Sequence, residues 1–402
     1  MTELYNTTVF PHLAFSNSDN QGREFGVILV KAAFDIDDDG RCKISDDQEP
    51  LCFTDRCHGD VNVSSLRQPS DLVSYKPGAD IIVDATAFAP EGRASSSWTA
   101  GVSVLSGERL LASKQLRVTG PRRWMPVWPS WLSENQKKNW QAHRKFFKGW
   151  KLSEPEETLS VPIRYELAYG GLQDRGLDEH GNPIIEAFEE NPVGSGWFDP
   201  EQGDLTGSYP APQIEALNDP IRDAAHHYKP EGFGPIPPAW LPRRKLGGTF
   251  DQQWLDTVAP KWPADYDFAY NNSAAEGLIL NEFPTGDLTI VLENLRPGTP
   301  RFTLTLPDPM ITMLVDAGDY DIATIRPNLD TIFLSVSSAK LFDCRVQLTW
   351  RMPFNPDTTE AILLAVPDKT DTAELAALAG AVRKAPHPDA CGVYCKELER
   401  ET

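Results

Sequence analysis

Residues 25–34, Phe-Gly-Val-Ile-Leu-Val-Lys-Ala-Ala-Phe, carry apolar side chains at both odd and even positions. Side chains of a strand alternate between the two faces of a sheet, so a strand of this composition needs cover on both faces. The run therefore predicts a central strand packed between two layers, with less completely covered strands beside it.

Strand patterning recurs toward both ends of the chain. Strands are predicted at residues 4–15, 79–88, 101–105 and 109–118, and again at 287–295, 302–306, 321–325, 330–336 and 346–350. Residues 302–306 and 346–350 alternate strictly between apolar and polar, which predicts one face in the core and one in water. Few helical segments separate these strands, so the sequence predicts a mainly β fold, of a β-rich α+β kind.

The middle of the chain interrupts this pattern, because residues 191–242 contain ten prolines. Proline has no N–H to donate to a sheet, so long ordered loops are expected there. We predict two sandwich-like β lobes, residues 1–165 and 286–402, joined by an irregular bridging segment at residues 166–285 that is rich in Pro and Gly.

Two helices are expected. Residues 132–148 lack Pro and Gly and are rich in helix formers, which predicts one helix inside a Trp-rich insertion near residues 125–150 of the N-terminal lobe. Residues 370–384 are rich in Ala and Leu and predict a late helix in the C-terminal lobe.

Charge and cysteine usage narrow the function classes. A net charge of −20 and a pI near 4.8 oppose binding to nucleic acid and to anionic membranes. No apolar run of about 18 residues is available to span a bilayer, and the first residues do not resemble an export signal. Six cysteines are too sparse for a secreted disulfide framework, so we expect reduced thiols and a cytoplasmic location.

Motifs that would carry chemistry are weak. Residues 35–40, Asp-Ile-Asp-Asp-Asp-Gly, match the start of a calcium loop, but Asp46 occupies the twelfth position, where a Glu is needed. A hairpin turn closed by Asp39 and Gly40 explains the same residues better. The seven histidines form no zinc-type spacing, and Cys391 and Cys395 are one residue too far apart for a thioredoxin-type pair. No metal or cofactor is therefore expected.

No nucleophile elbow and no phosphate-binding loop occurs in the sequence, so we expect a protein that is not an enzyme. A glycan hydrolase on a β scaffold stays as an alternative, because a pair of catalytic carboxylates carries no short signature and the chain has 58 acidic residues. A structural component of a larger assembly is the other alternative.

Ten segments, taken in order, resemble the bacterial family named domain of unknown function 2169. They are Val-Lys-Ala-Ala-Phe (30–34), Ser-Asp-Leu-Val-Ser-Tyr-Lys-Pro-Gly-Ala-Asp (70–80), Gly-Pro-Arg-Arg-Trp (120–124), Pro-Ile-Arg-Tyr-Glu-Leu-Ala-Tyr-Gly-Gly (162–171), Asn-Pro-Val-Gly (191–194), Gly-Phe-Gly-Pro-Ile (232–236), Trp-Leu-Pro-Arg (240–243), Gly-Thr-Phe-Asp-Gln-Gln-Trp (248–254), Asp-Tyr-Asp-Phe (265–268) and Leu-Thr-Trp-Arg (348–351). The sequence departs from the family pattern at Pro121, where an acid is common, and in residues 125–159, which look longer than usual.

The resemblance implies an adaptor or chaperone for a Gram-negative type VI secretion system. Members of the family are understood to hold a toxic effector, often one linked to a PAAR-type tip domain, and to help load it onto the VgrG-type spike. On this reading the partners are the effector and the spike, and no cofactor is involved. The sequence identifies neither the cargo nor the oligomeric state.

Candidate site residues fall into two groups. Partner-binding candidates are the aromatic and apolar residues of the insertion and of a Pro-rich loop: Trp128, Trp131, Trp140, Phe233, Ile236 and Trp240. Family-motif residues with a structural or binding role are Tyr75, Lys76, Pro77, Gly78, Asp80, Arg123, Trp124, Arg243, Asp251 and Trp254. The sequence leaves open which rings are exposed, and burial of the three insertion tryptophans against the sheet is the slightly favoured reading.

One motif turn and two motif arginines invite a local interpretation. We expect residues 75–78 to form a turn in which Pro77 fixes φ and Gly78 adopts a positive φ before the strand at Ile81. Arg123 and Arg243 are expected to stack on aromatic rings or to pair with acids in the core, or else to meet a partner.

Overall fold

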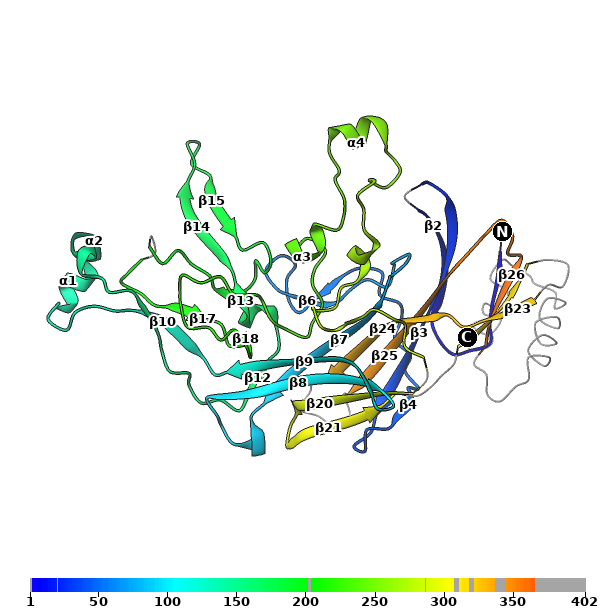
Figure 1. The fold of residues 1–402 in the computed structure, drawn as a ribbon, viewed down its shortest axis with the longest axis horizontal. Helices are drawn as coiled ribbons and strands as arrows, with labels where there is room; N and C mark the ends of the chain where they lie inside the picture. The colour runs from blue at the N-terminus through cyan, green and yellow to red at the C-terminus, as the bar shows by residue number, and fades with distance from the viewer. Residues whose placement is uncertain are drawn as a thin grey trace.

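In the computed structural model, the described residues are 2–19, 21–201, 204–285, 287–306, 311–317, 322–336 and 344–365. The late helix predicted at residues 370–384 lies outside them. Strands dominate, so the prediction of a mainly β fold is confirmed (Figure 1).

Two large sheets form the body of the protein. The eight-stranded sheet has the order β12 (Ser160–Pro162), β7 (Ala79–Phe88), β24 (Asn328–Val336), β25 (Arg345–Phe354), β3 (Glu24–Ile36) and β2 (His12–Ser18), with β19 (Ile279–Leu280) on β7 and β4 (Cys42–Ile44) on β3. The five-stranded sheet has the order β18 (Ile214–Ala216), β9 (Arg109–Thr119), β8 (Ser97–Ser106), β20 (Leu288–Arg296) and β21 (Thr299–Thr305).

The main hydrophobic core contains residues of both sheets. Ile28 and Val30 of β3 and Ile81 of β7 belong to the same buried cluster as Val102 of β8 and Ile290 of β20. The two large sheets therefore pack face to face as a sandwich. The other face of the eight-stranded sheet is covered by loops, and β3 is buried along both faces from Gly26 to Phe34, as its sequence predicts.

Smaller sheets flank the body. One joins β1 (Glu3–Asn6), β26 (Ala361–Ala365), β22 (Thr312–Asp316) and β23 (Ile322–Ile325). The others are β11 (Trp150–Leu152) with β10 (Arg122–Pro126) and β17 (Tyr209–Ala211), β13 (Tyr169–Gly170) with β16 (Ser195–Gly196), β14 (Leu172–Leu177) with β15 (Pro183–Ala187), and β5 (Arg56–Cys57) with β6 (Leu66–Gln68).

The helices are short. They are α1 (Glu134–Lys138), α2 (Trp140–His143), α3 (Leu241–Arg244) and α4 (Gln252–Thr257), with 3₁₀ turns at Pro90–Gly92, Arg144–Phe146, Tyr165–Leu167 and Phe268–Asn271. The single helix predicted at residues 132–148 is thus divided into α1, α2 and a 3₁₀ turn. The division falls at Asn139, whose φ of −90° and ψ of 51° are not helical.

The pairing of strands differs from the expectation of two lobes with sheets of their own. β24 lies parallel to β7, β25 lies antiparallel to β3, and β20 lies antiparallel to β8. Strands from the two ends of the chain therefore share both large sheets. Local patterning identifies a strand but carries no information about a partner more than 180 residues away, which is why the sequence does not predict this pairing.

Two local predictions have opposite outcomes. In β21, Phe302 and Leu304 are buried while Thr303 and Thr305 are exposed, so the predicted alternation is confirmed. In β25 the prediction of a wet face is wrong, because Gln347 and Thr349 are buried together with their apolar neighbours. Gln347 hydrogen-bonds to Gln68 of β6 and to Glu49 of a loop, and both segments cover this face of the sheet.

The acidic segment at residues 35–40 forms a hairpin turn between β3 and β4, as expected. Asp37 Oδ1 accepts hydrogen bonds from the backbone N–H groups of Asp39 and Arg41, at 3.0 and 2.8 Å. Gly40 has a φ of +79°, and a Cβ at this position would lie 2.0 Å from the Thr303 carbonyl oxygen. The residues that resemble a calcium loop thus have a complete explanation as a tight turn.

Three projections extend from the body (Figure 1). We call residues 125–151, with α1 and α2, the helical arm. The hairpin β14–β15 is the ribbon, and residues 247–263, with α4, are the α4 loop. All three lie outside the two large sheets.

Candidate functional site

Segments of the family motifs that are far apart in sequence meet over the loop-covered face of the eight-stranded sheet. The Asn271 side-chain amide donates to the Tyr75 carbonyl at 2.7 Å, and that of Asn272 donates to the Gly78 carbonyl at 2.9 Å. Arg243 donates from Nε to the Tyr270 carbonyl at 2.9 Å. The turn before β7, helix α3 and the 3₁₀ turn Phe268–Asn271 are thereby joined in one place.

Beneath this junction, a row of polar side chains crosses four adjacent strands. Asp80 of β7 pairs in register with Thr331 of β24, Thr331 with Thr349 of β25, and Thr349 with Lys31 of β3. Directly paired residues share a face, so these four side chains lie on the same face of the sheet. All four are buried.

Asp80 is the most completely satisfied member of this row. It accepts from Lys76 Nζ at 2.7 Å, from the Asn272 amide at 2.9 Å and from the Ser273 backbone N–H at 2.9 Å. Burial alone would raise the pKa of Asp80, but the Lys76 ammonium and these hydrogen bonds outweigh burial, so the pKa lies below its ordinary value. The carboxylate is held in its ionised form.

Two further ion pairs attach the covering loops to the same face. Lys31 Nζ lies 3.0 Å from Asp71 Oδ2, which also accepts from the Cys52 backbone N–H at 2.7 Å. Arg351 pairs with Asp330 and donates from Nη2 to the Asp71 carbonyl at 2.9 Å. Lys76, Asp71, Arg351 and Asp330 thus join the four residues of the row, and we call all eight the buried row. Its three cations and three carboxylates are all paired, which suits a role in holding the loops in place.

An aromatic cluster covers this junction at the surface. Tyr75 meets Phe268 edge to face at a centroid distance of 5.6 Å, and Phe268 meets Tyr266 at 5.3 Å. The Arg243 guanidinium lies 5.2 Å from the centroid of Tyr270, so stacking on an aromatic ring is the one of the open alternatives that this residue adopts. Tyr75 is partly exposed, so the cluster reaches solvent.

The turn at residues 75–78 delivers the chain into β7, but Gly78 does not have a positive φ, and that part of the prediction is wrong. Glycine is required for another reason. A Cβ on Gly78 would lie 2.3 Å from the Leu280 carbonyl oxygen, because the short strand β19 packs directly against this point. Pro77 and Gly78 thus fit the chain between β7 and β19.

Phe233 and Trp240, two of the partner-binding candidates, belong to the hydrophobic core. Phe233 is 0% exposed, and Trp240 packs edge to face against the buried Tyr165 at 5.4 Å. Ile236 is half-buried against the same core. These three residues hold the Pro-rich loop on the body, and in this structure neither Phe233 nor Trp240 can contact a partner.

The three tryptophans of the insertion have a different position. None of them is buried against the sheet, and Trp131 is 62% exposed. Trp131 packs edge to face on Phe146 at 4.9 Å, Trp128 packs on Phe147 at 5.5 Å, and Trp140 is half-buried. The slightly favoured expectation of burial is therefore wrong, because the insertion projects from the body and its rings pack on each other.

Of the motif residues at 122–124, Arg123 lies at the surface and hydrogen-bonds to Ser208, with no ring or acid beside it in the described part of the chain. Its neighbour Arg122 makes the buried ion pair instead, 2.6 Å from Glu215. Trp124 is 1% exposed and packs with Tyr169, Phe198 and Tyr228 in a cluster of its own. It anchors the base of the helical arm.

In the α4 loop, Asp251 caps α4 by accepting from the Trp254 backbone N–H at 2.8 Å. Trp254 donates from Nε1 to the Lys261 carbonyl at 2.9 Å and packs against Phe250. Both motif residues therefore shape the loop, while Phe250 and Leu255 remain exposed.

Sequence reasoning missed the apolar side chains of the ribbon. Leu172, Leu177, Ile184 and Ile185 are all exposed there. It also missed Lys31, Asp71, Asp330 and Arg351 of the buried row. A sequence signal for the buried charges was available, because Lys31 is the only charged residue in the apolar run at residues 25–34.

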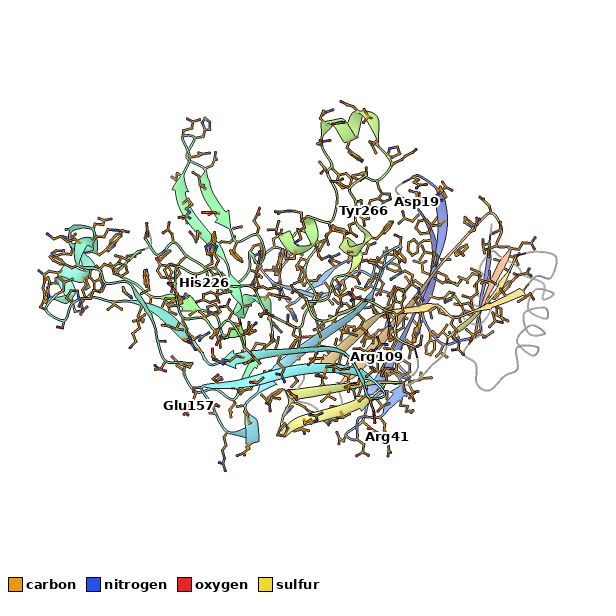
Figure 2. The ribbon with its side chains drawn as sticks, viewed as in Figure 1. Asp19, Arg41, Arg109, Glu157, His226 and Tyr266 are labelled. Atoms are coloured by element: carbon orange, nitrogen blue, oxygen red, sulfur yellow. The ribbon has the colours of Figure 1, made fainter. Side chains whose placement is uncertain are left out.

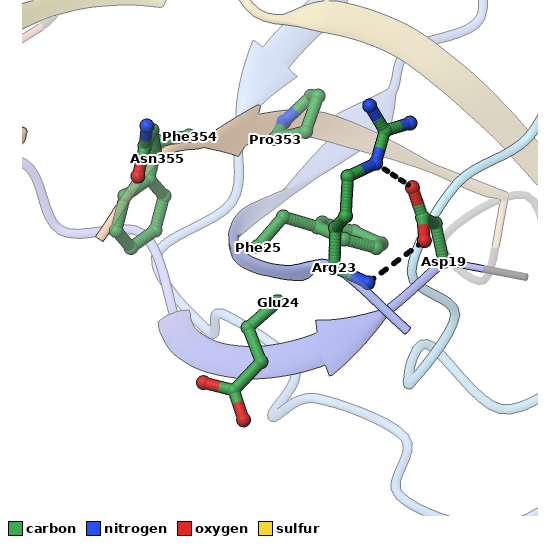
Figure 3. A pocket seen from close by; sticks show the side chains of 7 residues that line it. All are labelled: Asp19, Arg23, Glu24, Phe25, Pro353, Phe354 and Asn355. Carbon is green, nitrogen blue, oxygen red and sulfur yellow. Dashed lines mark hydrogen bonds and ion pairs between the residues drawn. The ribbon is translucent and has the colours of Figure 1, made fainter. Parts of the chain in front are cut away.

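A surface pocket of about 370 Å³ lies at the ends of β3 and β25 (Figure 3). It is lined by Phe25, Phe354 and the ion pair of Arg23 with Asp19, whose N···O distance is 2.7 Å. Hydrogen bonds from the Arg23 backbone and side chain lower the pKa of Asp19. The Phe354 ring covers Gly26, where any Cβ would collide with it, so this pocket is part of the local packing.

Within the described residues, no three His, Cys, Asp or Glu side chains gather as a set of metal ligands. In the same part of the chain, no helix is both long and apolar enough to cross a bilayer.

The fold and the site define a β-sandwich protein in which the motif segments fasten loops over a buried charged row. A family model described as "Uncharacterized protein conserved in bacteria (DUF2169)" matches residues 21–351. The chain belongs to this family. No curated protein and no solved structure matches it.

Proposed function

We propose that this protein is a cytoplasmic adaptor that binds a type VI secretion effector, one linked to a PAAR-type domain, and helps load it onto the VgrG-type spike. The proposal starts from the resemblance of the motif segments and from membership of the family. It assigns the protein no catalytic role, since the six charges of the buried row are engaged with each other and with the backbone.

One structural observation carries the proposal: all three projections present apolar side chains to solvent. Leu177 of the ribbon is 68% exposed, Trp131 of the helical arm 62%, and Leu255 of the α4 loop 57%. Exposed apolar side chains on elements that extend from a packed body are typical of a surface that a partner covers. The buried row stabilises the scaffold from which the α4 loop extends.

The test is capture of partners from the native cytoplasm by the tagged full-length protein, with the captured chains identified by mass spectrometry. We expect an effector and a spike protein at near-stoichiometric ratio. A ribbon variant, Leu177→Ser with Ile184→Ser and Ile185→Ser, should lose much of the effector. The matched control, Leu110→Ser with Leu159→Ser, changes leucines exposed to a similar extent on the body and should retain it.

Recovery of the tagged protein alone, in cells that express the secretion genes, would contradict the adaptor role. Equal loss of effector in the ribbon and control variants would contradict the part assigned to the projections.

A further inference from the structure

The helical arm has the opposite charge to the rest of the protein. Its cations are Lys137, Lys138, Arg144, Lys145, Lys148 and Lys151, and its one acid is Glu134. The whole chain has a net charge of −20, so the remainder is still more acidic than that value. The cations are concentrated on an element that extends away from the acidic body (Figures 1 and 2).

Most of these cations form no ion pair among the described residues. Lys137 pairs with Glu134 at 2.6 Å, whereas Lys138, Arg144, Lys145, Lys148 and Lys151 are exposed. Within the described residues, none of these five exposed cations makes an ion pair. Arg144 and Lys145 instead lie over the rings of Trp140 and Phe146, at 5.6 and 5.1 Å. The arm thus creates a local positive potential that its own chain does not neutralise.

Apolar surface lies beside these charges. The Trp131 ring is exposed on Phe146, and a cavity of about 330 Å³ lies between the arm and residues 205–208. Trp128, Lys137 and Lys138 line this cavity, together with Glu134, which is paired with Lys137. A site with ammonium groups next to indole rings fits a ligand in which carboxylates alternate with apolar side chains.

We infer that the helical arm is the docking site for an acidic, apolar-bearing segment of a partner protein. Carboxylates of that segment meet the exposed lysines, and an apolar side chain covers Trp131. This inference rests on the proposed adaptor function and names the chemistry of the partner.

Charge distribution favours a protein segment over nucleic acid or an anionic membrane. Electrostatic attraction is screened within about 8–10 Å at physiological salt, so a short segment experiences the arm alone. Nucleic acid and a lipid surface extend their negative charge past the arm and would face the acidic body.

The test uses the full-length protein and a fluorescent synthetic peptide of Glu and Leu, with binding followed by fluorescence anisotropy at several salt concentrations. The arm variant combines Lys138→Glu, Lys145→Glu, Lys148→Glu and Lys151→Glu. The control variant combines Lys43→Glu, Arg93→Glu, Lys245→Glu and Lys261→Glu, which are exposed cations outside the arm and give the same change in net charge. Circular dichroism and thermal melts should show that both variants fold.

We expect the arm variant to bind the peptide at least tenfold more weakly than the control variant, and the affinity of the wild type to fall as salt rises. The inference is overturned if both variants lose affinity equally or if the wild type does not bind. Tighter, arm-dependent binding to duplex DNA or to phosphatidylglycerol vesicles would also overturn it. The inference would also be overturned if light scattering showed that the wild type and the control variant form a salt-sensitive dimer and the arm variant does not.

The outcomes separate this inference from the proposed function. If the arm variant captures as much effector as the wild type, the inference fails while the adaptor function stands. If the wild type captures no effector but still binds the peptide through the arm, the function fails and the docking site stands.

Discussion

The Lys76 ammonium lies 2.7 Å from an Asp80 carboxylate oxygen, and the same ammonium donates to the Thr331 hydroxyl, also at 2.7 Å. One lysine therefore links the turn before β7 to two neighbouring strands, β7 and β24. Both members of the ion pair are buried, with side-chain exposures of 4% and 0%. The pair sits where segments distant in sequence are held on the sheet.

Removing one partner of this pair should be costly. We expect Lys76→Met and Asp80→Asn each to lower the free energy of unfolding by about 3–5 kcal/mol, because each leaves a buried charge uncompensated. The double variant should lose less than the sum of the two losses. Urea unfolding followed by fluorescence measures the free energy of unfolding of the two single variants and the double variant. Single variants within about 1 kcal/mol of the wild type would show that the pair does not hold this junction.

The loss of stability of the folded protein at acid pH should depend on Asp80. The pKa of Asp80 is lower in the folded protein than its ordinary value of 3.8. At a pH between the folded pKa and 3.8, Asp80 is therefore protonated in the unfolded chain but ionised in the folded one. The stabilisation is complete above pH 3.8 and is lost as pH falls through the folded pKa. The unfolding midpoint of the wild type should therefore decline more steeply below about pH 4 than that of Asp80→Asn. Asp46→Asn, at an exposed acid, should follow the wild-type curve, and parallel curves for all three would argue against this role.

Gly78 should tolerate no side chain. In Gly78→Ala, the new Cβ would meet the Leu280 carbonyl oxygen and push β19 away from β7, at an expected cost of about 1–3 kcal/mol. Gly207→Ala is the matched control, since nothing lies within 4 Å of its Cβ position. Thermal melts compare the two, and equal stability of both variants would mean that β19 moves aside freely.

Two tryptophans of one region should behave in opposite ways. Trp124→Ala should lower the free energy of unfolding by about 3–5 kcal/mol, because the ring is enclosed by other aromatic residues at the base of the arm. Trp131→Ala should change it by no more than about 0.5 kcal/mol, since the ring is exposed. Denaturant titration measures the free energy of unfolding of both variants. A large loss for Trp131→Ala would mean that the ring supports the fold of the arm.

Individual residues show how much of the fold and of the candidate site could be predicted from the sequence. Burial of both faces of β3 was predictable, because consecutive apolar residues in a strand place apolar side chains on both faces of the sheet. Burial of Gln347 was not predictable, because it depends on Gln68 of β6 and Glu49 of a loop, which are both distant from β25 in sequence. Asp80 and Arg243 were identified as motif residues, yet their respective partners Asn272 and Tyr270 come from a segment that patterning does not connect with them.

The aromatic candidates show the same limit. Phe233 and Trp131 look alike in sequence, since each is a large ring in an irregular segment. The first packs in the main core and the second projects into solvent, because only the first follows a loop that lies back on the sheet. Which outcome applies depends on the path of the backbone, and a pattern of residue types does not specify that path.

The position of β24 and β25 between β7 and β3 has a consequence for synthesis on the ribosome. The strands at the centre of the eight-stranded sheet emerge long after the strands beside them, since β7 ends at Phe88 and β24 begins only at Asn328. Until then β7 and β3 each lack a neighbour, and Lys31, Asp71, Lys76 and Asp80 cannot complete the buried row with Arg351 and Asp330. Nascent chains that stop before this hairpin therefore expose two open strand edges to proteases and chaperones, and the cell can recognise such chains as unfinished.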